Sequence, residues 1–408
     1  MFTQHESKTL RGLADTVRKI SEGPRHEQNI SRWRTHTSLG GGKPMVFVFP
    51  DGAWSELLPP DSLTCESPLA QNIEAALRKK ILRAKYVQDD VPVIGEIVLP
   101  KVIHNSMWGV EPKVIQSGTE RGAWKHLPII EKASDWEKLK MPVVEYDEYE
   151  TQKQYEAVCS CLGDILPVRR TGVTNFSFHL LHWYCDYRGM ENLFMDLIDD
   201  PEMVHYAISF FTRGMHAMLD QIERQGLVSK NCDDTFHYTG GVGYTDNELP
   251  EDKDSYSLSD VWGAAEAQEF SSVSPDMHEE FVLRYERTIL ERFGLNGYGC
   301  CDDLSKKLPN VLKIKNLRRV AVCPWADIAD FTPVLQKNYI MTWKPLPTHL
   351  AMEHFDEEAV RKELTEGLEK AKGGVIELVL RDTNTCRNDF ERFNHWIRIA
   401  RQVIECGS

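Results

Sequence analysis

The chain has 408 residues, of which 41% are apolar, and 48 Lys+Arg against 62 Asp+Glu give a net charge of −14. This charge, without a long basic run, disfavours nucleic acid as a partner. No stretch approaches about 18 uninterrupted apolar residues, and the first residues lack a basic, apolar leader, so we expect a cytoplasmic protein with no membrane partner. Ten cysteines are too few for a disulfide scaffold, and we interpret them as reduced thiols.

In chain order, the sequence predicts an N-terminal helical extension over residues 1–43 and then eight buried strands, several of them continuous apolar runs, as parallel strands covered on both faces require. The predicted strands span 44–50, 92–99, 164–172, 232–239, 294–300, 317–323, 338–344 and 374–381. Amphipathic helices lie between several of them. The clearest helix start signals are Asp200-Pro201, Ser274-Pro275 and Asp356.

Repeated strand-helix units indicate an α/β fold, and eight strands favour a single TIM barrel, a (β/α)8 fold, with long loop insertions over a doubly wound open sheet. Residues 1–408 then form one domain. The insertions are 51–90, 101–160 and 241–272. We expect segment 241–260, rich in Gly and Asp, to be a lid loop over the carboxyl ends of the strands.

Three cysteines, Cys301, Cys323 and Cys386, follow predicted strands, so a barrel would bring them to one mouth. Three protein ligands with a fourth position open are typical of catalytic zinc. Cys300 is the alternative to Cys301, because adjacent side chains of an extended chain face opposite ways. The competing interpretation is that all three are small buried apolar residues.

Other strand-end residues suggest the rest of a site. His237 is a candidate acid or base that could equally be a hydrogen-bonded core histidine, and Asp51 and Glu269 are candidate carboxylates, although a solvated helix face would explain Glu269 as well. Histidines 179, 182 and 278 fall on helical patterns and are expected to pack in the core. The candidate substrate-binding residues, which suit a flat organic ligand, are Trp54, Tyr238, Tyr244, Trp325, Trp343 and Lys344.

The run from Trp262 to Phe293 contains Gln268-Glu269-Phe270-Ser271, Ser274-Pro275-Asp276-Met277 and Glu280-Phe281-Val282-Leu283. In this run the chain resembles the uroporphyrinogen decarboxylase-like superfamily, and the similarity extends more weakly from Ser31 through the last helix. Within the superfamily it resembles the zinc- and corrinoid-dependent methyltransferases, including the methyltransferase component of O-demethylases. Cys301, or Cys300, and Cys386 stand where those enzymes place cysteines.

The resemblance implies a zinc-dependent transfer of a methyl group from a methoxylated, aromatic small molecule to the cobalt of a corrinoid on a separate protein. Many relatives have His-x-Cys at the first cysteine, where this chain has Gly299 before Cys301. Methyl transfer from the corrinoid to a thiol or folate, a metal-free decarboxylase or lyase using Asp51, His237 and Lys344, and a non-catalytic barrel are the alternatives. Monomer and homo-oligomer stay open.

Overall fold

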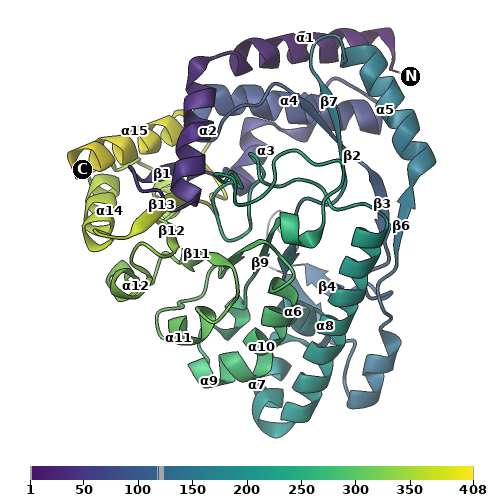
Figure 1. Ribbon diagram of the computed structural model, residues 1–408, viewed down its shortest axis with the longest axis vertical. Helices are drawn as coiled ribbons and strands as arrows, with labels where there is room; N and C mark the ends of the chain where they lie inside the picture. The colour runs from purple at the N-terminus through teal and green to yellow at the C-terminus, as the bar shows by residue number, and fades with distance from the viewer. Residues whose placement is uncertain (1, 117, 119–123, 408) are drawn as a thin grey trace.

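The computed structural model describes residues 2–116, 118 and 124–407 and combines many helices with one large parallel sheet (Figure 1). The α-helices are α1 (Gln4–Ser21), α2 (Pro24–Thr37), α3 (Trp54–Leu57), α4 (Pro68–Tyr86), α5 (Glu148–Leu162), α6 (Leu180–Arg188), α7 (Met190–Asp199), α8 (Pro201–Arg224), α9 (Pro275–His278), α10 (Arg284–Leu290), α11 (Leu308–Val311), α12 (Ile328–Leu335), α13 (Thr348–Ala351), α14 (Glu357–Lys370) and α15 (Glu391–Cys406). Among the described residues, no helix has the length and apolar character needed to cross a bilayer.

The large sheet is parallel, with the strand order β1-β13-β12-β11-β10-β9-β8. Its strands are β1 (Met45–Val48), β8 (Ser177–Phe178), β9 (Trp262–Ala265), β10 (Leu295–Tyr298), β11 (Leu317–Val322), β12 (Ile340–Trp343) and β13 (Val375–Leu380). The predicted α/β class is therefore confirmed. This seven-stranded parallel sheet is compatible with a barrel-like fold, although an eighth strand and closure are not seen in the described residues.

The outer edge of β1 is capped by side chains instead of by a strand. The backbone N–H groups of Val46 and Val48 donate to Asp90 Oδ2 at 2.9 Å and to Asp89 Oδ2 at 2.7 Å. Both carboxylates are buried and face Arg32 and Arg83. They satisfy the donors that a further strand would otherwise pair with.

The remaining strands form three two-stranded ribbons. These are parallel β2 (Ile97–Pro100) with β7 (Val168–Thr171), and antiparallel β3 (Val102–Asn105) with β6 (Val144–Asp147) and β4 (Lys113–Gln116) with β5 (Trp124–Leu127). Helices α1, α4 and α5 lie beside one another at one end of the molecule, and their apolar faces form a second core with β2 and β7 (Figure 1). Helices α1 and α2 occupy most of the predicted N-terminal extension.

One predicted strand is absent, and one predicted helix is a strand. Residues 232–239 form no strand, and only an isolated bridge joins Phe236 to Val242. Conversely, Trp262–Ala265 is strand β9, although we expected a helix there that would carry Glu269. The Ala-rich sequence has high helix propensity, but pairing with β8 and β10 fixes it as a strand.

The segment 236–243 lies across the inner face of the large sheet. An ideal Cβ on Gly240 would come within 2.1 Å of Thr342 Cγ2 in β12, and one on Gly297 in β10 within 2.5 Å of Thr239 Oγ1. Arg319 in β11 donates to the Val242 carbonyl at 2.8 Å. The inner face is therefore filled by backbone of this chain, and the absence of side chains at these glycines makes the close approach feasible.

The helix start signals are confirmed. The side chains of Asp200, Ser274 and Asp356 accept hydrogen bonds from backbone N–H groups in the first turns of α8, α9 and α14, respectively. In each case a short polar side chain satisfies a donor that the helix leaves free.

Segment 241–260, which we expected over the carboxyl ends of the strands, runs instead towards their amino ends. Glu248 forms an ion pair with Arg318 at the start of β11, and the Gly294 N–H before β10 donates to the Val261 carbonyl. Residues 251–260 then lead directly into β9. The structure therefore places most of this segment at the amino ends of the strands, whereas the predicted site residues gather at the carboxyl ends.

Candidate active site

The carboxyl ends of β8, β9, β10, β12 and β13 bring several polar side chains together. We call this group the mouth cluster, and it consists of His179, Tyr238, Glu266, Cys300, Cys301, Lys344 and Arg381. Tyr238 reaches it from the segment that crosses the inner face. In parallel α/β folds, ligands bind at the carboxyl ends of the strands, so this end of the sheet is the candidate active site.

Cys300 and Cys301 form a pair of neighbouring thiols. Their Sγ atoms are 3.5 Å apart because the chain bends after β10, with Gly299 at φ +92°. The expectation that only one of them faces the site is therefore wrong, since it assumed an extended chain. Lys344 Nζ lies 3.3 Å from Cys300 Sγ and donates to the Cys300 carbonyl at 2.9 Å.

The surroundings of the pair favour one negative charge on it. The Cys301 thiol donates to Cys300, and this bond, together with Lys344 and Arg381, holds the pKa of Cys300 well below its usual value despite burial. The same bond raises the pKa of Cys301. Cys300 is 4% exposed and Cys301 is more open, so the pair presents a thiolate with one accessible sulfur.

His179 is the residue that the sequence interpretation missed. Its Nδ1 lies 2.6 Å from Glu266 Oε1, its Nε2 lies 2.9 Å from Ser177 Oγ, and its ring centroid is 4.4 Å from that of Tyr238. Burial raises the pKa of Glu266, against the effect of His179. The feature that could have identified His179 is its position in the sequence. It directly follows strand β8 and precedes helix α6, so it does not lie within a helix.

Glu269 lies behind this pair. It is buried, and His182 Nδ1 is 3.5 Å from its Oε1. That hydrogen bond raises the pKa of His182. Glu266 and Glu269 repel one another, so the predicted carboxylate Glu269 adds negative charge to the region that holds His179.

Arg381 and Asp51 form the other side of the mouth. Arg381 donates to the Tyr238 carbonyl at 3.1 Å, and its Nη2 is 3.9 Å from Asp51 Oδ1. Asp51 Oδ2 accepts the Asp382 N–H at 2.5 Å. Burial raises the pKa of Asp51. Asp51 thus lies at the mouth as expected, as one partner of a cation.

Within the described residues, neither of the other two candidate metal ligands forms a hydrogen bond with the thiol pair. The Cys386 thiol donates to Glu56 Oε2 at 3.1 Å, and Cys323 is fully buried, which raises its pKa to about 11. Across the described ranges, no three His, Cys, Asp or Glu side chains lie close enough together to hold a metal ion. This arrangement does not fit a three-cysteine zinc site. Zinc binding stays a prediction.

His237 does not reach the mouth. It is buried under the sheet, its Nε2 lies 3.2 Å from the Asn231 carbonyl, and its ring packs on Trp262. Burial lowers its pKa to about 3. The structure therefore separates His237 from Asp51 and Lys344, the three residues of the decarboxylase or lyase alternative.

The predicted aromatic residues have four different environments. Trp325 is 69% exposed and donates from Nε1 to the Cys301 carbonyl at 3.1 Å, so it stands at the rim beside the thiols. Trp343 points to the outer face, against Gly367 of α14. Trp54 lies in α3 under Lys79, and Tyr244 lines a different cavity. Trp325 and Tyr238 are therefore the aromatic residues nearest the thiols.

A cavity of about 510 Å³ adjoins this rim between α12 and α14. Its walls include Trp325, Trp343 and the His349–Glu363 pair, whose Nε2 and Oε2 atoms are 3.1 Å apart. The cavity gives space for a flat ligand next to the exposed indole of Trp325.

No family model matches this chain, and no curated protein matches it by sequence. Among solved structures, the fold is similar to that of a methyltransferase from Methanosarcina mazei, with a TM-score of 0.51. The two chains are 10% identical, and the likeness covers 92% of this chain and 98% of the other. At this identity the comparison shows the fold alone.

Proposed function

We propose that this chain is a methyltransferase that takes a methyl group from a methoxylated, flat aromatic molecule and passes it to the cobalt of a corrinoid carried by a separate protein. The observation that carries the proposal is the Cys300–Cys301 pair, with Lys344 Nζ 3.3 Å from Cys300 Sγ at the carboxyl edge of the sheet. The similarity of the fold to a methyltransferase supports it.

A thiolate is a strong nucleophile towards a methyl carbon. In the first half of the reaction, a sulfur of the pair attacks the methyl group as its bond to oxygen breaks. The leaving oxygen takes a proton, which we assign to His179 because Glu266 Oε1, 2.6 Å from Nδ1, holds the imidazole ring in place at the mouth. The products are an S-methylated cysteine and a phenol.

The rim residues position the donor. The exposed indole of Trp325 offers a flat apolar face next to Cys301, and Tyr238 stands between the thiols and His179. In the second half, the methyl group leaves the sulfur for the corrinoid acceptor, which regenerates the thiolate. The acceptor must come from outside, since the sequence has no Asp-x-His-x-x-Gly motif.

The described side chains do not fit a three-cysteine zinc site, so no step above uses a metal ion. Zinc would act as a Lewis acid on the ether oxygen, the task that the proposal gives to the proton of His179. Transfer in the opposite direction, from the corrinoid to a thiol, would use the same thiol pair.

The first half of the reaction can be tested alone. Purified protein is incubated with a panel of methoxyarenes without an acceptor, and peptide mass spectrometry measures methylation. We expect one added methyl group on the peptide with Cys300 and Cys301, and none in Cys300→Ser or Cys301→Ser. The control Cys406→Ser changes an exposed thiol far from the mouth and should react as the wild type does.

The second half is tested by adding reduced corrinoid protein and following methylation of the corrinoid by absorbance. Metal analysis of the same samples separates the two mechanisms. Stoichiometric zinc that is lost together with activity in Cys386→Ala would overturn the thiolate mechanism and support the three-cysteine site. Activity that survives chelation and Cys386→Ala supports the thiol pair.

A further inference from the structure

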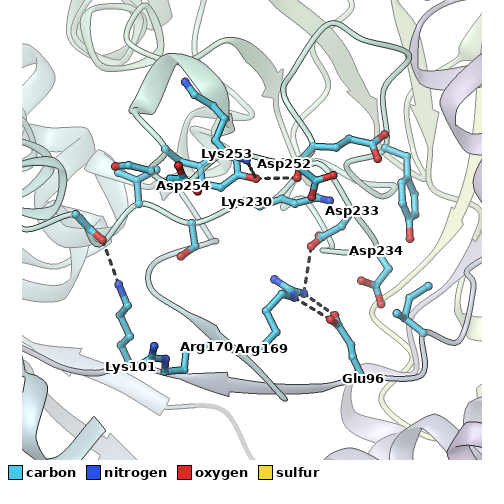
Figure 2. Close-up of a pocket in the computed structure, with 18 of the residues that line it drawn as sticks. Glu96, Lys101, Arg169, Arg170, Lys230, Asp233, Asp234, Asp252, Lys253 and Asp254 are labelled. Carbon is cyan, nitrogen blue, oxygen red and sulfur yellow. Dashed lines mark hydrogen bonds and ion pairs between the residues drawn. The ribbon is translucent and has the colours of Figure 1, made fainter. Parts of the chain in front are cut away.

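A second cavity, of about 910 Å³, lies between the β2–β7 ribbon and the segments that precede β9 (Figure 2). Its walls come from β7, residues 228–234, Tyr244 and residues 251–256. Since residues 251–260 lead into the start of β9, this cavity is on the amino-terminal side of the sheet. It is therefore separate from the mouth cluster, and Tyr244, which we expected at the mouth, belongs here.

Part of the charge in this cavity is already paired. Arg169 donates to both carboxylate oxygens of Glu96, at 2.6 and 2.9 Å, and to Asp233 at 3.3 Å (Figure 2). Lys101 donates to the Gly226 carbonyl at 3.2 Å. These contacts fix the floor of the cavity.

Three further groups in the cavity lack such partners. Tyr244 is 6% exposed, and its hydroxyl makes no hydrogen bond within the described part of the chain. Over the same residues, the carboxylate of Asp234 and the ammonium of Lys230 have no hydrogen bond or ion pair, and Figure 2 draws no contact to Asp234. The three groups therefore line one cavity with a hydroxyl, a carboxylate and an ammonium group with which a bound ligand can pair.

The charged groups around Asp234 strengthen this point. Burial and the neighbouring Asp233 raise the pKa of Asp234 to about 6, Glu96 acts in the same direction, and Lys80 and Arg169 act against it. The carboxylate thus lacks a close cation. An ammonium group is the ligand chemistry that would supply one.

We infer that this cavity binds a small zwitterion of the α-amino acid class. The ammonium group of the ligand binds Asp234 and the Tyr244 hydroxyl, and its carboxylate binds Lys230. The cavity wall carries acidic and basic side chains in similar numbers, so it suits a ligand with both charges better than a polyanion or a polycation. This site is independent of methyl transfer at the mouth.

The test is calorimetric titration of the full chain with the twenty common L-amino acids, followed by single-charge analogues of those that bind. For L-alanine the analogues are ethylamine, which lacks the carboxylate, and propionate, which lacks the ammonium group. We expect at least one amino acid to bind, and each analogue to bind at least about tenfold more weakly. Binding of no amino acid, or equal binding of an analogue, would overturn the inference.

Variants locate the site. Asp234→Asn and Lys230→Met should each weaken binding at least about tenfold, and Tyr244→Phe should weaken it less. Asp199→Asn, an exposed carboxylate on α7, is the control. Thermal unfolding of each variant without ligand checks folding. Unchanged affinity in folded Asp234→Asn and Lys230→Met would place the ligand elsewhere and contradict the proposal.

A second readout does not depend on the variants. An ammonium group bound beside Asp234 lowers the pKa of that carboxyl, so at about pH 6 binding should release protons. Titrations in two buffers with different ionisation enthalpies measure the number released. Proton release supports the assigned contact, and proton uptake would contradict it.

Discussion

At the scale of single residues, the thiol pair and Lys344 depend on one another. Lys344 is buried, and no carboxylate of the described residues lies within ion-pair distance of its ammonium group. A buried ammonium without a counter-charge is costly, so its closest compensation is a thiolate on Cys300. The lysine and the pair therefore act as one ionic unit.

Replacing Lys344 with Met should raise the pKa of the thiol pair. Below that pKa, the rate of alkylation by iodoacetamide follows the thiolate fraction, and it falls about tenfold for each unit that the pKa rises. The measurement is the rate of alkylation at Cys300 and Cys301 from about pH 5 to pH 9. The midpoint of the profile should move to higher pH in the variant.

Lys306→Met is the matched control, because Lys306 is exposed and close in sequence to the pair. Its profile should equal that of the wild type. A Lys344→Met profile with an unchanged midpoint would show that the lysine does not set the charge of the pair.

The sequence interpretation placed several residues at the carboxyl ends of the strands, and the structure shows which of them lie there, while their roles stay predictions. Cys300, Cys301, Lys344, Tyr238 and Asp51 all reach the mouth. His179 and Arg381 were missed, because their role depends on the end of a two-residue strand and on a ring contact made by a loop. Spacing along the chain shows neither of these.

At the scale of elements, the bend after β10 creates the site. Gly299 has φ +92°, and a Cβ there would come within 2.5 Å of Leu304 Cδ1 and 3.2 Å of Ala321 Cβ. Only glycine combines this conformation with this space. The bend turns both sulfurs to the same side, which an extended continuation of the strand would prevent.

Gly299→Ala should therefore destabilise the protein by roughly 1–3 kcal/mol and separate the two sulfurs. Urea unfolding measures the first effect. Loss of bridging by phenylarsine oxide, which needs two adjacent thiols, measures the second.

Gly12→Ala in α1 provides the opposite control. Nothing lies within 4 Å of its Cβ position, so the change should stabilise the helix by about 0.5–1 kcal/mol. Equal stability of the two variants would show that the bend does not require glycine.

The strands that the sequence predicted well include β11 and β13, which end in the apolar stretches 320–322 and 378–380. Residues 232–239 are similarly apolar in part, yet they cross the sheet instead of joining it. The glycines at 240, 241 and 243 indicate that this segment crosses the sheet, because they allow its backbone to approach the sheet closely. No local pattern gives the direction of such a segment.

At the scale of the whole molecule, the inner face is held by a buried ionic group. Arg319 donates to Glu377 Oε1 at 3.1 Å and to the Val242 carbonyl, and Thr342 donates to the same Glu377 oxygen at 2.7 Å. Burial opposes the charge of Glu377, but Arg319 and His36 outweigh it and hold the pKa of Glu377 at about 2. The group joins β11, β12 and β13 to the crossing segment.

Glu377→Gln leaves the buried Arg319 without its counter-charge and should cost roughly 3–5 kcal/mol in unfolding free energy. Urea unfolding measures the loss. Glu366→Gln, which changes an exposed carboxylate on α14, should change stability by less than about 0.5 kcal/mol. Similar losses in the two variants would mean that the ionic group does not hold the inner face together.

Two buried histidines make the stability of the whole molecule sensitive to mild acid. Burial lowers the pKa of His237, on the inner face, and of His278, on the outer face, to about 3, from a usual value of 6.5. Between these values the unfolded chain binds a proton at each ring that the folded chain does not, so unfolding free energy falls as pH falls. Each ring contributes about 1.4 kcal/mol per pH unit below pH 6.5. Urea unfolding at about pH 7, 6 and 5 measures this slope. His278→Gln should reduce the slope by the contribution of one histidine. An unchanged slope in this variant would mean that His278 is protonated in the folded chain.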